Sequence, residues 1–408
     1  MEQRGFVFVE ENLSSPTQAL ATFLARVPVA PRAFERIRLE DASGRILAER
    51  IVSDADYPAA PRSAMDGFAI AASGAPGRFA IVGQVAMGRQ WSLRLASGDA
   101  VAIPTGGVLP DGADVVVPIE HARVAGLSLT VDGTYAPGTN VNPRAGDMHQ
   151  GDVVLEPGTR IGGPQLGVLA TLGVTVVPVY PRPRIAVISS GDELVPPGMK
   201  PAVGQVRDSN RYAIAGALQG MGAQPFHGAT VSDVPGALER ALRKSLAEAD
   251  AAMLTGGSSV GERDATPAAI KALGSPGVIV HGLRVKPGKP TVLAAIGAKP
   301  VIGLPGNPTS ALVILEAVVA PIIAALVGGP LPLSTVTARL AARARSVLGW
   351  TWYVPVRLHQ DEAGWVAEPL QIRSSLVTLT ARADGYVTLP EETEEIKAGS
   401  RVTVHRFV

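Results

Sequence analysis

The stretch that decides the fold is Arg184–Leu194, which reads RIAVISSGDEL. Its first part, Ile185–Ile188, is a short apolar run rich in β-branched residues, and such a run before a turn signal predicts a buried strand. Tyr212–Met221 then has apolar residues at helical spacing and is followed by Gly222. The segment therefore begins as strand, loop and helix.

The same alternation continues downstream. Ser232 is placed to cap a helix that carries Leu238 and Leu246 on one face, and Ala251–Leu254 is a further short apolar run. Strands that alternate with helices of this length predict an α/β fold with a doubly wound parallel sheet over residues 182–329.

Ligands of such sheets bind beyond the carboxyl ends of the strands. The unusual loops of this sequence fall at those ends. They are 189–194 (SSGDEL), 255–261 (TGGSSVG), 286–290 (KPGKP) and 303–308 (GLPGNP).

The segments on either side of residues 182–329 have a different residue pattern. Residues 51–139 contain short apolar runs split by Gly and Pro, which predicts a β-rich domain. We expect it to be inserted into a discontinuous α/β scaffold domain of residues 14–50 and 140–181, which opens with a helix capped at Ser15. Residues 330–408 alternate apolar and polar positions and predict a C-terminal β domain.

Composition restricts the possible functions. The chain has 408 residues, of which 46% are hydrophobic and 18% charged, as expected for a folded multidomain protein. Its net charge of +1 provides no overall field for nucleic acid or an anionic membrane, so neither is expected as a partner. The absence of cysteine excludes disulfides, thiolate nucleophiles and cysteine zinc sites.

The apolar segments do not predict export or membrane insertion. The N-terminal sequence MEQRGFVFVEENLSS carries acids where a signal peptide needs an uninterrupted apolar core, so we expect a cytoplasmic protein. The most apolar stretch, Ser310–Gly328, is interrupted by Glu316 and Pro321. It predicts a buried core helix rather than a membrane span.

The glycine-rich loop 255–261 has three interpretations. Backbone N–H groups of such a loop before a helix can bind an anion. A nucleoside-triphosphate P-loop is rejected, because Glu262 and Arg263 stand where Lys and Ser or Thr are required. Residues 257–261 also match G-x-S-x-G, which would make Ser259 a hydrolase nucleophile, but the chain lacks the glycine-rich oxyanion segment of such enzymes.

Charged side chains in the loops are suited to a phosphorylated ligand. Lys286 and Lys289 flank a stiff Pro-Gly pair, and two restrained ammonium groups suit a polyanion. Asp192, Glu193 and Asp264 supply oxygen ligands of the kind that Mg²⁺ takes beside a phosphate. The six histidines show no short zinc-ligand spacing.

Seven motifs in order resemble those of the MoeA family of molybdopterin molybdenumtransferases, which includes eukaryotic gephyrin. They are 63–69 (SAMDGFA), 104–114 (PTGGVLPDGAD), 189–194 (SSGDEL), 206–210 (VRDSN), 256–264 (GGSSVGERD), 285–290 (VKPGKP) and 303–308 (GLPGNP). Residues 384–390 (DGYVTLP) resemble part of the family's last domain.

The resemblance implies an elongated homodimer of four-domain subunits. It implies an enzyme that splits adenylylated molybdopterin, releases AMP and leaves molybdenum from molybdate on the dithiolene, with Mg²⁺ as cofactor. The β-rich domain of one subunit would face the α/β domain of the other. The molybdopterin adenylyltransferase and molybdoenzyme apoproteins are further implied partners, and the motifs do not distinguish molybdate from tungstate.

The resemblance also implies residue roles. Catalytic roles fall on Asp66, Thr105, Glu193, Asp233 and Asp264, and the metal ligands are Glu193 and Asp264. Asp147 is also assigned as a functional acid, because it lies at the family's spacing before Gly151-Asp152. Ligand binding is assigned to Ser190, Gly191, Asp192, Gly256, Gly257, Ser259, Gly261, Lys286, Lys289, Pro305, Gly306 and Asn307.

The sequence departs from the family pattern at a few positions: Arg62 replaces the usual Asn, Ser258 a Val and Asp384 an Asn, and Ala145-Gly146 stand where the family has Gly-Glu before Asp147. None of the first three changes removes a carboxylate or lysine that the chemistry would use. Because gephyrin also acts as a scaffold, a non-catalytic binding paralogue is the alternative function. Retention of all five functional acids argues against it.

Overall fold

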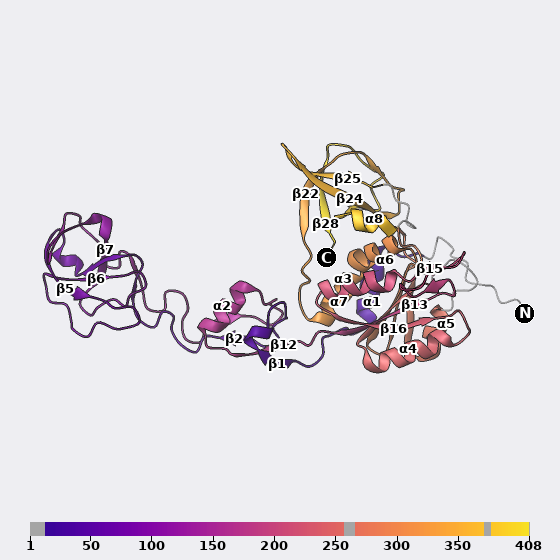
Figure 1. Ribbon diagram of the computed structural model, residues 1–408, viewed down its shortest axis with the longest axis horizontal. Coiled ribbons are helices and arrows are strands. Elements are labelled where there is room, and N and C mark those ends of the chain that lie inside the picture. The colour runs from indigo at the N-terminus through magenta and orange to yellow at the C-terminus, as the bar shows by residue number, and fades with distance from the viewer. Residues whose placement is uncertain (1–12, 257–265, 371–376, 408) are drawn as a thin grey trace, which may run out of the picture. The chain divides into compact units, whose positions relative to one another are not determined.

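The computed structural model describes residues 13–256, 266–370 and 377–407 (Figure 1). The chain divides into two compact units. One comprises Met1–Ala48, Gly158–Leu166 and Thr175–Val408, and the other comprises Glu49–Pro157 and Gly167–Val174.

A six-stranded α/β sheet forms the centre of the first unit. Its strands, in spatial order, are β16 (Gln224–Val231), β13 (Arg184–Ser190), β17 (Ala251–Thr255), β21 (Lys299–Leu304), β20 (Val292–Ile296) and β18 (Pro276–His281). The first four are mutually parallel, which confirms the predicted doubly wound sheet.

One strand, β20, departs from the expected all-parallel arrangement, whereas β18 runs in the same direction as the first four. β20 pairs antiparallel with both β18 and β21. Only Gly297 and Ala298 separate β20 from β21, and Gly297 has a φ of +59°. A two-residue connection can join antiparallel neighbours but cannot make the crossover that a parallel pair requires.

Helices cover both faces of this sheet (Figure 1). Successive residues of a strand point to opposite faces, so Ile185 and Val187 enter one core while Ala186 and Ile188 enter the other. The first core is covered by α1 (Pro16–Arg26), α3 (Asn210–Gly220), α6 (Pro308–Ile314), η5 (Leu315–Val319) and α7 (Ala320–Val327). The second is covered by α4 (Ala237–Glu248) and α5 (Thr266–Leu273).

Helix α1 begins as predicted but packs elsewhere. Ser15 Oγ accepts a hydrogen bond from the Gln18 backbone N–H at 3.3 Å, which caps the helix. Ala19 and Phe23 are fully buried in the core with Ile185 and other sheet residues. The helix therefore packs in the α/β core, although its position in the sequence predicts that it belongs to the discontinuous domain. The remaining domain bounds stay a prediction.

The most apolar segment is a core helix. Among the described residues, Pro308–Val327 has the length and hydropathy of a membrane span, but 72% of it is buried inside the protein. Pro321 lies at the start of α7, directly after the π-helical turn η5. A proline there lacks the N–H that a continuous helix would use, and the wider turn accommodates that loss.

The C-terminal part of this unit is a closed β-barrel. Its strands pair in a ring made of β24 (Thr351–Asp361), β25 (Gly364–Pro369), β22 (Thr335–Leu340), β28 (Arg401–Arg406) and β26 (Gly385–Leu389), with β26 returning to β24. This confirms the predicted β domain. The helix α8 (Val377–Arg382) was not predicted, because six residues are too few to show helical periodicity.

The second unit is built on the predicted β-rich sheet. Its strands, in spatial order, are β7 (Val115–Pro118), β4 (Gly67–Ile70), β6 (Asp99–Ile103), β5 (Gly77–Gln84), β9 (Ser128–Val131) and β8 (Ala122–Ala125). Phe68, Ile70, Phe79 and Leu129 lie in the core on one face of this sheet. Short pairs β3 (Arg62–Ser63) with β10 (Val141–Asn142) and β2 (Ile51–Val52) with β11 (Val153–Leu155) extend the unit.

The remaining elements are short. They are β1 (Glu35–Arg38) paired with β12 (Val176–Val179), β14 (Leu194–Val195) paired with β15 (Val206–Arg207), β23 (Ala344–Arg345) paired with β27 (Glu395–Ile396), β19 (Val285–Lys286), η2 (Leu39–Asp41), η3 (Ala72–Gly74), η4 (Ile119–His121) and α2 (Gly163–Thr171).

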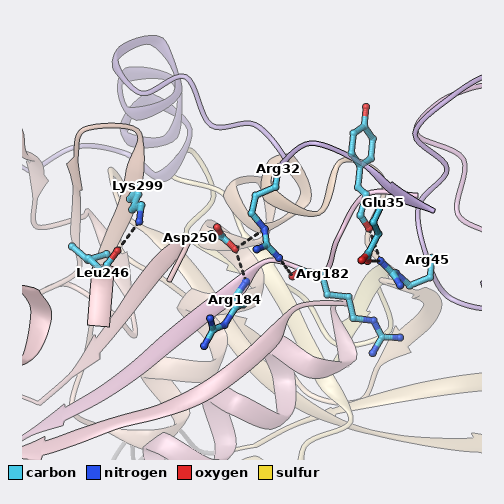
Figure 2. Close-up of polar contacts among 9 residues, drawn as sticks. Arg32, Glu35, Arg45, Arg182, Arg184, Leu246, Asp250 and Lys299 are labelled. Carbon is cyan, nitrogen blue, oxygen red and sulfur yellow. Dashed lines mark hydrogen bonds and ion pairs between the residues drawn. The ribbon is translucent and has the colours of Figure 1, made fainter. Parts of the chain in front are cut away.

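Polar contacts hold the amino-terminal edge of the α/β sheet (Figure 2). Asp250 Oδ2 accepts a hydrogen bond from the Arg184 backbone N–H at 2.7 Å and lies 3.4 Å from Arg32 Nε. Lys299 Nζ donates to the Leu246 carbonyl at 2.6 Å, and an ion pair joins Glu35 to Arg45. Arg184 and Lys299 are the first residues of their strands, so the contacts of Asp250 and Lys299 lie at the edge opposite the predicted ligand loops.

Candidate functional site

The sheet register gathers the predicted loops at one edge. Ser189 is paired with Thr255, and Thr255 with Leu304. Across the antiparallel strands, Val292 is paired with both Gly303 and His281. The segments that follow Ser190, Thr255, Leu304 and His281 therefore start side by side at the carboxyl edge, as we predicted from the strand order.

Two of these loops touch through their backbones. Gly256 has a φ of +88°, and a Cβ built on it would lie 1.9 Å from the carbonyl oxygen of Ser190. A Cβ on Gly306 would lie 3.7 Å from Gly256 Cα. Three predicted binding residues, Ser190, Gly256 and Gly306, thus lie in contact, and only glycine fits at Gly256.

Acidic side chains lie together beside this contact. Ser190 Oγ donates a hydrogen bond to Asp233 Oδ1 at 3.3 Å, and the Asp233 backbone N–H donates to Asp192 Oδ1 at 3.0 Å. The Glu193 carboxylate folds back over Gly191, with an oxygen 2.5 Å from the position a Gly191 Cβ would take. The acids are solvent-exposed, so a ligand can reach them.

The helix start after β16 corrects one expectation. We expected Ser232 to cap this helix, but α4 begins at Ala237 and its cap position is Gly236, with a φ of +76°. The left-handed residue separates the helix from the preceding chain. Asp233 consequently lies in a loop beside Asp192 rather than inside a helical turn.

Asn210 is a site residue that the sequence reasoning missed. Its Nδ2 donates to Thr255 Oγ1 at 2.9 Å and to the Gly306 carbonyl at 2.7 Å. Its Oδ1 is buried and has no hydrogen-bond partner within the described residues. One amide therefore ties together the loops after β17 and β21. The available signal was its place in the motif 206–210, which we noted without assigning a role to it.

The two lysines lie where the α/β domain meets the barrel. β19, which ends at Lys286, pairs parallel with β24 of the barrel. Lys286 Nζ lies 4.3 Å from the centroid of the Trp352 ring, and Lys289 Nζ lies 5.6 Å from that of Trp350. A Cβ on Gly288, whose φ is +114°, would lie 2.3 Å from Ile314 Cδ1 on α6, so the turn between the lysines requires glycine.

Some of the predicted positions cannot be placed. Gly257, Ser259, Gly261 and Asp264 lie outside the described residues, as does the departure Ser258. Pro305 and Asn307 lie in the loop before α6, and the Asn307 carbonyl accepts a hydrogen bond from the Ala311 N–H at 2.9 Å.

Asp66 and Thr105 form a close pair in the β-rich unit. Asp66 Oδ1 accepts hydrogen bonds from the Thr105 backbone N–H at 2.6 Å and from Thr105 Oγ1 at 2.9 Å. These two hydrogen bonds hold the pKa of the Asp66 carboxyl below its usual value of 3.8, and the backbone bond makes the larger contribution. Arg62 Nη1 donates to the Gly106 carbonyl at 2.8 Å, so this departure supports the turn that presents Thr105.

Asp147 lies in a different loop of that unit. Its backbone N–H donates to the Tyr57 carbonyl at 3.1 Å, and its side chain is exposed. The neighbouring Asp56 accepts from the Gln150 N–H at 3.0 Å and from Arg144 Nε at 2.8 Å, and these bonds lower the pKa of the Asp56 carboxyl. A catalytic role for Asp147 stays a prediction.

The family models match three consecutive regions of the chain. The MoeA N-terminal region (domains I and II) matches residues 14–173, a probable molybdopterin-binding domain matches 186–325, and the MoeA C-terminal region (domain IV) matches 337–407. The molybdopterin molybdenumtransferase of Synechocystis sp. is 33% identical over 371 residues, which cover 88% of this chain and 92% of that protein. The chain belongs to the MoeA family.

Further relatives agree over nearly the whole length. The molybdopterin molybdenumtransferase of Haemophilus influenzae is 30% identical over 408 residues, 96% of this chain and 98% of that protein. A crystal structure of the MoeA molybdopterin biosynthesis protein from Pyrococcus horikoshii is 31% identical, with a TM-score of 0.78 and coverage of 97% of this chain and 99% of that one. The MoeA fold that we expected from the motifs is confirmed.

The departure at Asp384 has a structural explanation within the MoeA barrel. Asp384 Oδ2 accepts a hydrogen bond from the Leu358 backbone N–H at 2.7 Å, and its own N–H donates to the Val356 carbonyl at 2.9 Å. The carboxylate therefore fastens the start of β26 to β24.

The contact between Gly256 and Ser190 predicts an unequal response to alanine. Gly204 has a similar φ of +90° but open space around its Cα, so Gly204→Ala carries only backbone strain, about 1 kcal/mol. Gly256→Ala adds a clash with backbone, and we expect it to lower the free energy of unfolding by at least about 2 kcal/mol more. Denaturant unfolding of both variants measures the difference, and equal losses would contradict the close approach.

The Asp66–Thr105 pair predicts a pKa change. Thr105→Val removes the hydroxyl donor and keeps the backbone donor, so the pKa of Asp66 should rise but stay below 3.8. A carboxyl whose folded pKa is depressed stabilises the fold above its unfolded pKa and loses that contribution as the pH falls through the folded pKa. Carboxyl ¹³C NMR against pH measures the shift, with the exposed Thr134→Val as the control. An unchanged Asp66 pKa would show that the hydroxyl bond is absent in solution.

Proposed function

We propose that this protein is a molybdopterin molybdenumtransferase of molybdenum cofactor biosynthesis. It would take adenylylated molybdopterin and molybdate, split the phosphoanhydride with release of AMP, and leave molybdenum on the dithiolene. The observation that carries the proposal is the meeting of Ser190, Gly256 and Gly306 beside exposed acids at the carboxyl edge of the sheet. The name carried by its full-length relatives supports the same reaction.

In this proposal, some residues bind the phosphates and others orient the reacting groups. Lys286 and Lys289 would offer charged donors to phosphate oxygens, and the sequence predicts backbone N–H donors in the loop 255–261. Anhydride cleavage needs an oxygen that attacks in line with the leaving group. In our proposal an oxygen of molybdate attacks the adenylyl phosphorus, the P–O bond of the anhydride breaks, and the molybdopterin phosphate leaves. The dithiolene sulfurs then bond to molybdenum, and AMP departs with the attacking oxygen as that Mo–O bond breaks. Glu193, Asp233 and, from the sequence, Asp264 would orient the reacting groups. Asp66 and Thr105 are proposed to act in the same reaction.

The donor set fits Mg²⁺. Glu193 and Asp264 would hold the ion, which when bound would neutralise charge on the phosphates. Within the described part of the chain, no group of three His, Cys, Asp or Glu side chains could hold a metal alone. Two carboxylates are enough for Mg²⁺ in this proposal, because that ion usually takes one or two together with waters and substrate phosphates.

The proposal predicts that Glu193→Gln removes activity without unfolding the protein. The substitution keeps the shape and removes the charge, so AMP release from adenylylated molybdopterin with Mg²⁺ and molybdate should fall at least about a hundredfold. The thermal midpoint should stay within a few degrees, as for other exposed residues.

Glu362→Gln is the matched control, because Glu362 is an exposed glutamate in a barrel hairpin. It should leave AMP release unchanged. Wild-type protein that releases no AMP with molybdate or with tungstate would favour the non-catalytic alternative. A Glu193→Gln variant with full activity would remove Glu193 from the mechanism.

We also propose a cytoplasmic homodimer, on the strength of the family resemblance. Sedimentation equilibrium should give twice the chain mass of 42.1 kDa across micromolar concentrations. A mass of one chain throughout that range would overturn the dimer and leave the proposed reaction to be judged by the AMP assay.

A further inference from the structure

The two lysines are each placed against an indole ring. The Lys286 ammonium lies 4.3 Å from the Trp352 ring centroid, and the Lys289 ammonium lies 5.6 Å from that of Trp350. Both separations fall within the roughly 6 Å over which a cation is attracted to the face of an aromatic ring, and tryptophan is the strongest partner. Trp352 lies on β24 of the barrel and Trp350 directly precedes that strand, whereas Lys286 ends β19 and Lys289 follows it.

The main chain around the lysines is held independently of the rings. The Leu283 N–H donates to the Lys289 carbonyl at 2.8 Å, and Thr291 Oγ1 donates to the Gly288 carbonyl at 2.7 Å. On the barrel side, the Thr351 N–H donates to the Arg284 carbonyl at 3.0 Å. These contacts fix the lysine backbones and leave the long side chains to be ordered by their surroundings.

We infer that Trp350 and Trp352 are positioning residues that hold the two ammonium groups for phosphate binding. This inference rests on the proposed function, in which the lysines bind the phosphates of adenylylated molybdopterin. A lysine side chain loses much rotamer freedom when it binds a ligand, and a ring that already restrains it lowers that cost. The Trp352 ring contacts one side of the Lys286 ammonium, which has three N–H donors and can offer others to phosphate oxygens.

The test is a double-mutant cycle on the full-length protein. Calorimetry without molybdate measures the Kd for adenylylated molybdopterin in Trp352→Leu, Trp352→Phe, Lys286→Ala and the Lys286→Ala/Trp352→Leu double variant. We expect Trp352→Leu to weaken binding about threefold to tenfold and Trp352→Phe to weaken it less. The double variant should bind no more weakly than Lys286→Ala alone, because the ring acts through the lysine. Trp350 and Lys289 form a second cycle with the same expectation.

A second measurement detects the contact without a ligand. Methylene protons beside an indole face are shifted upfield, so the side-chain NMR signals of Lys286 should move downfield in Trp352→Leu. Trp365→Leu is the matched control: Trp365 is a partly exposed tryptophan on β25 of the same barrel and should affect neither the signals nor the Kd.

The outcomes separate this inference from the proposed function. Additive losses in the cycle, or unchanged Kd in Trp352→Leu, overturn the inference while AMP release can still support the reaction. Unchanged Kd in Lys286→Ala overturns the role of the lysine and the inference with it. Tight, coupled binding without AMP release supports the inference and overturns the catalytic proposal.

Discussion

Parallel pairing of β13 with β16 and β17 is the constraint on which the rest of the site depends. Parallel strands end at the same edge of a sheet, so the register that pairs Ser189 with Thr255 also brings their following loops together. The pairing is stable because β13 is buried on both faces, with Ile185 and Val187 in one core and Ala186 and Ile188 in the other.

The two edges of this sheet have different tasks. At the amino edge, the side chains of Asp250 and Lys299 make contacts that join strands, helices and the preceding chain. At the carboxyl edge, the backbones approach so closely that Gly256 has no room for a side chain, and the acids around it remain exposed. Polar groups with a structural role therefore lie at the edge away from the ligand loops. Exposed charged side chains lie at the edge where a phosphorylated substrate would bind in our proposal.

The barrel meets the site beside the short strand β19. β19 leaves the loop after β18, pairs with β24 and brings Lys286 opposite Trp352. Closure of the barrel by the β24–β26 pairing leaves β19 as an added edge strand rather than a member of the ring. The surroundings of the lysines therefore come from both the α/β domain and the barrel.

The sequence alone determined the features that depend on local pattern: the buried strands, the loops at their ends, the β-rich and C-terminal β domains and the family motifs. An apolar run such as Ile185–Ile188 indicates that its strand is buried. A glycine such as Gly256 is typical of a position where the backbone leaves no room for a side chain. Only the tertiary structure decided the antiparallel β20, the packing of α1 on the α/β core, the late start of α4, the bridge made by Asn210 and the rings over the lysines. Most of these depend on contacts between residues far apart in the chain, and Asn210 and Gly306 are separated by 96 positions. No periodicity within one segment can encode such a contact, because its energy arises only when both segments have folded.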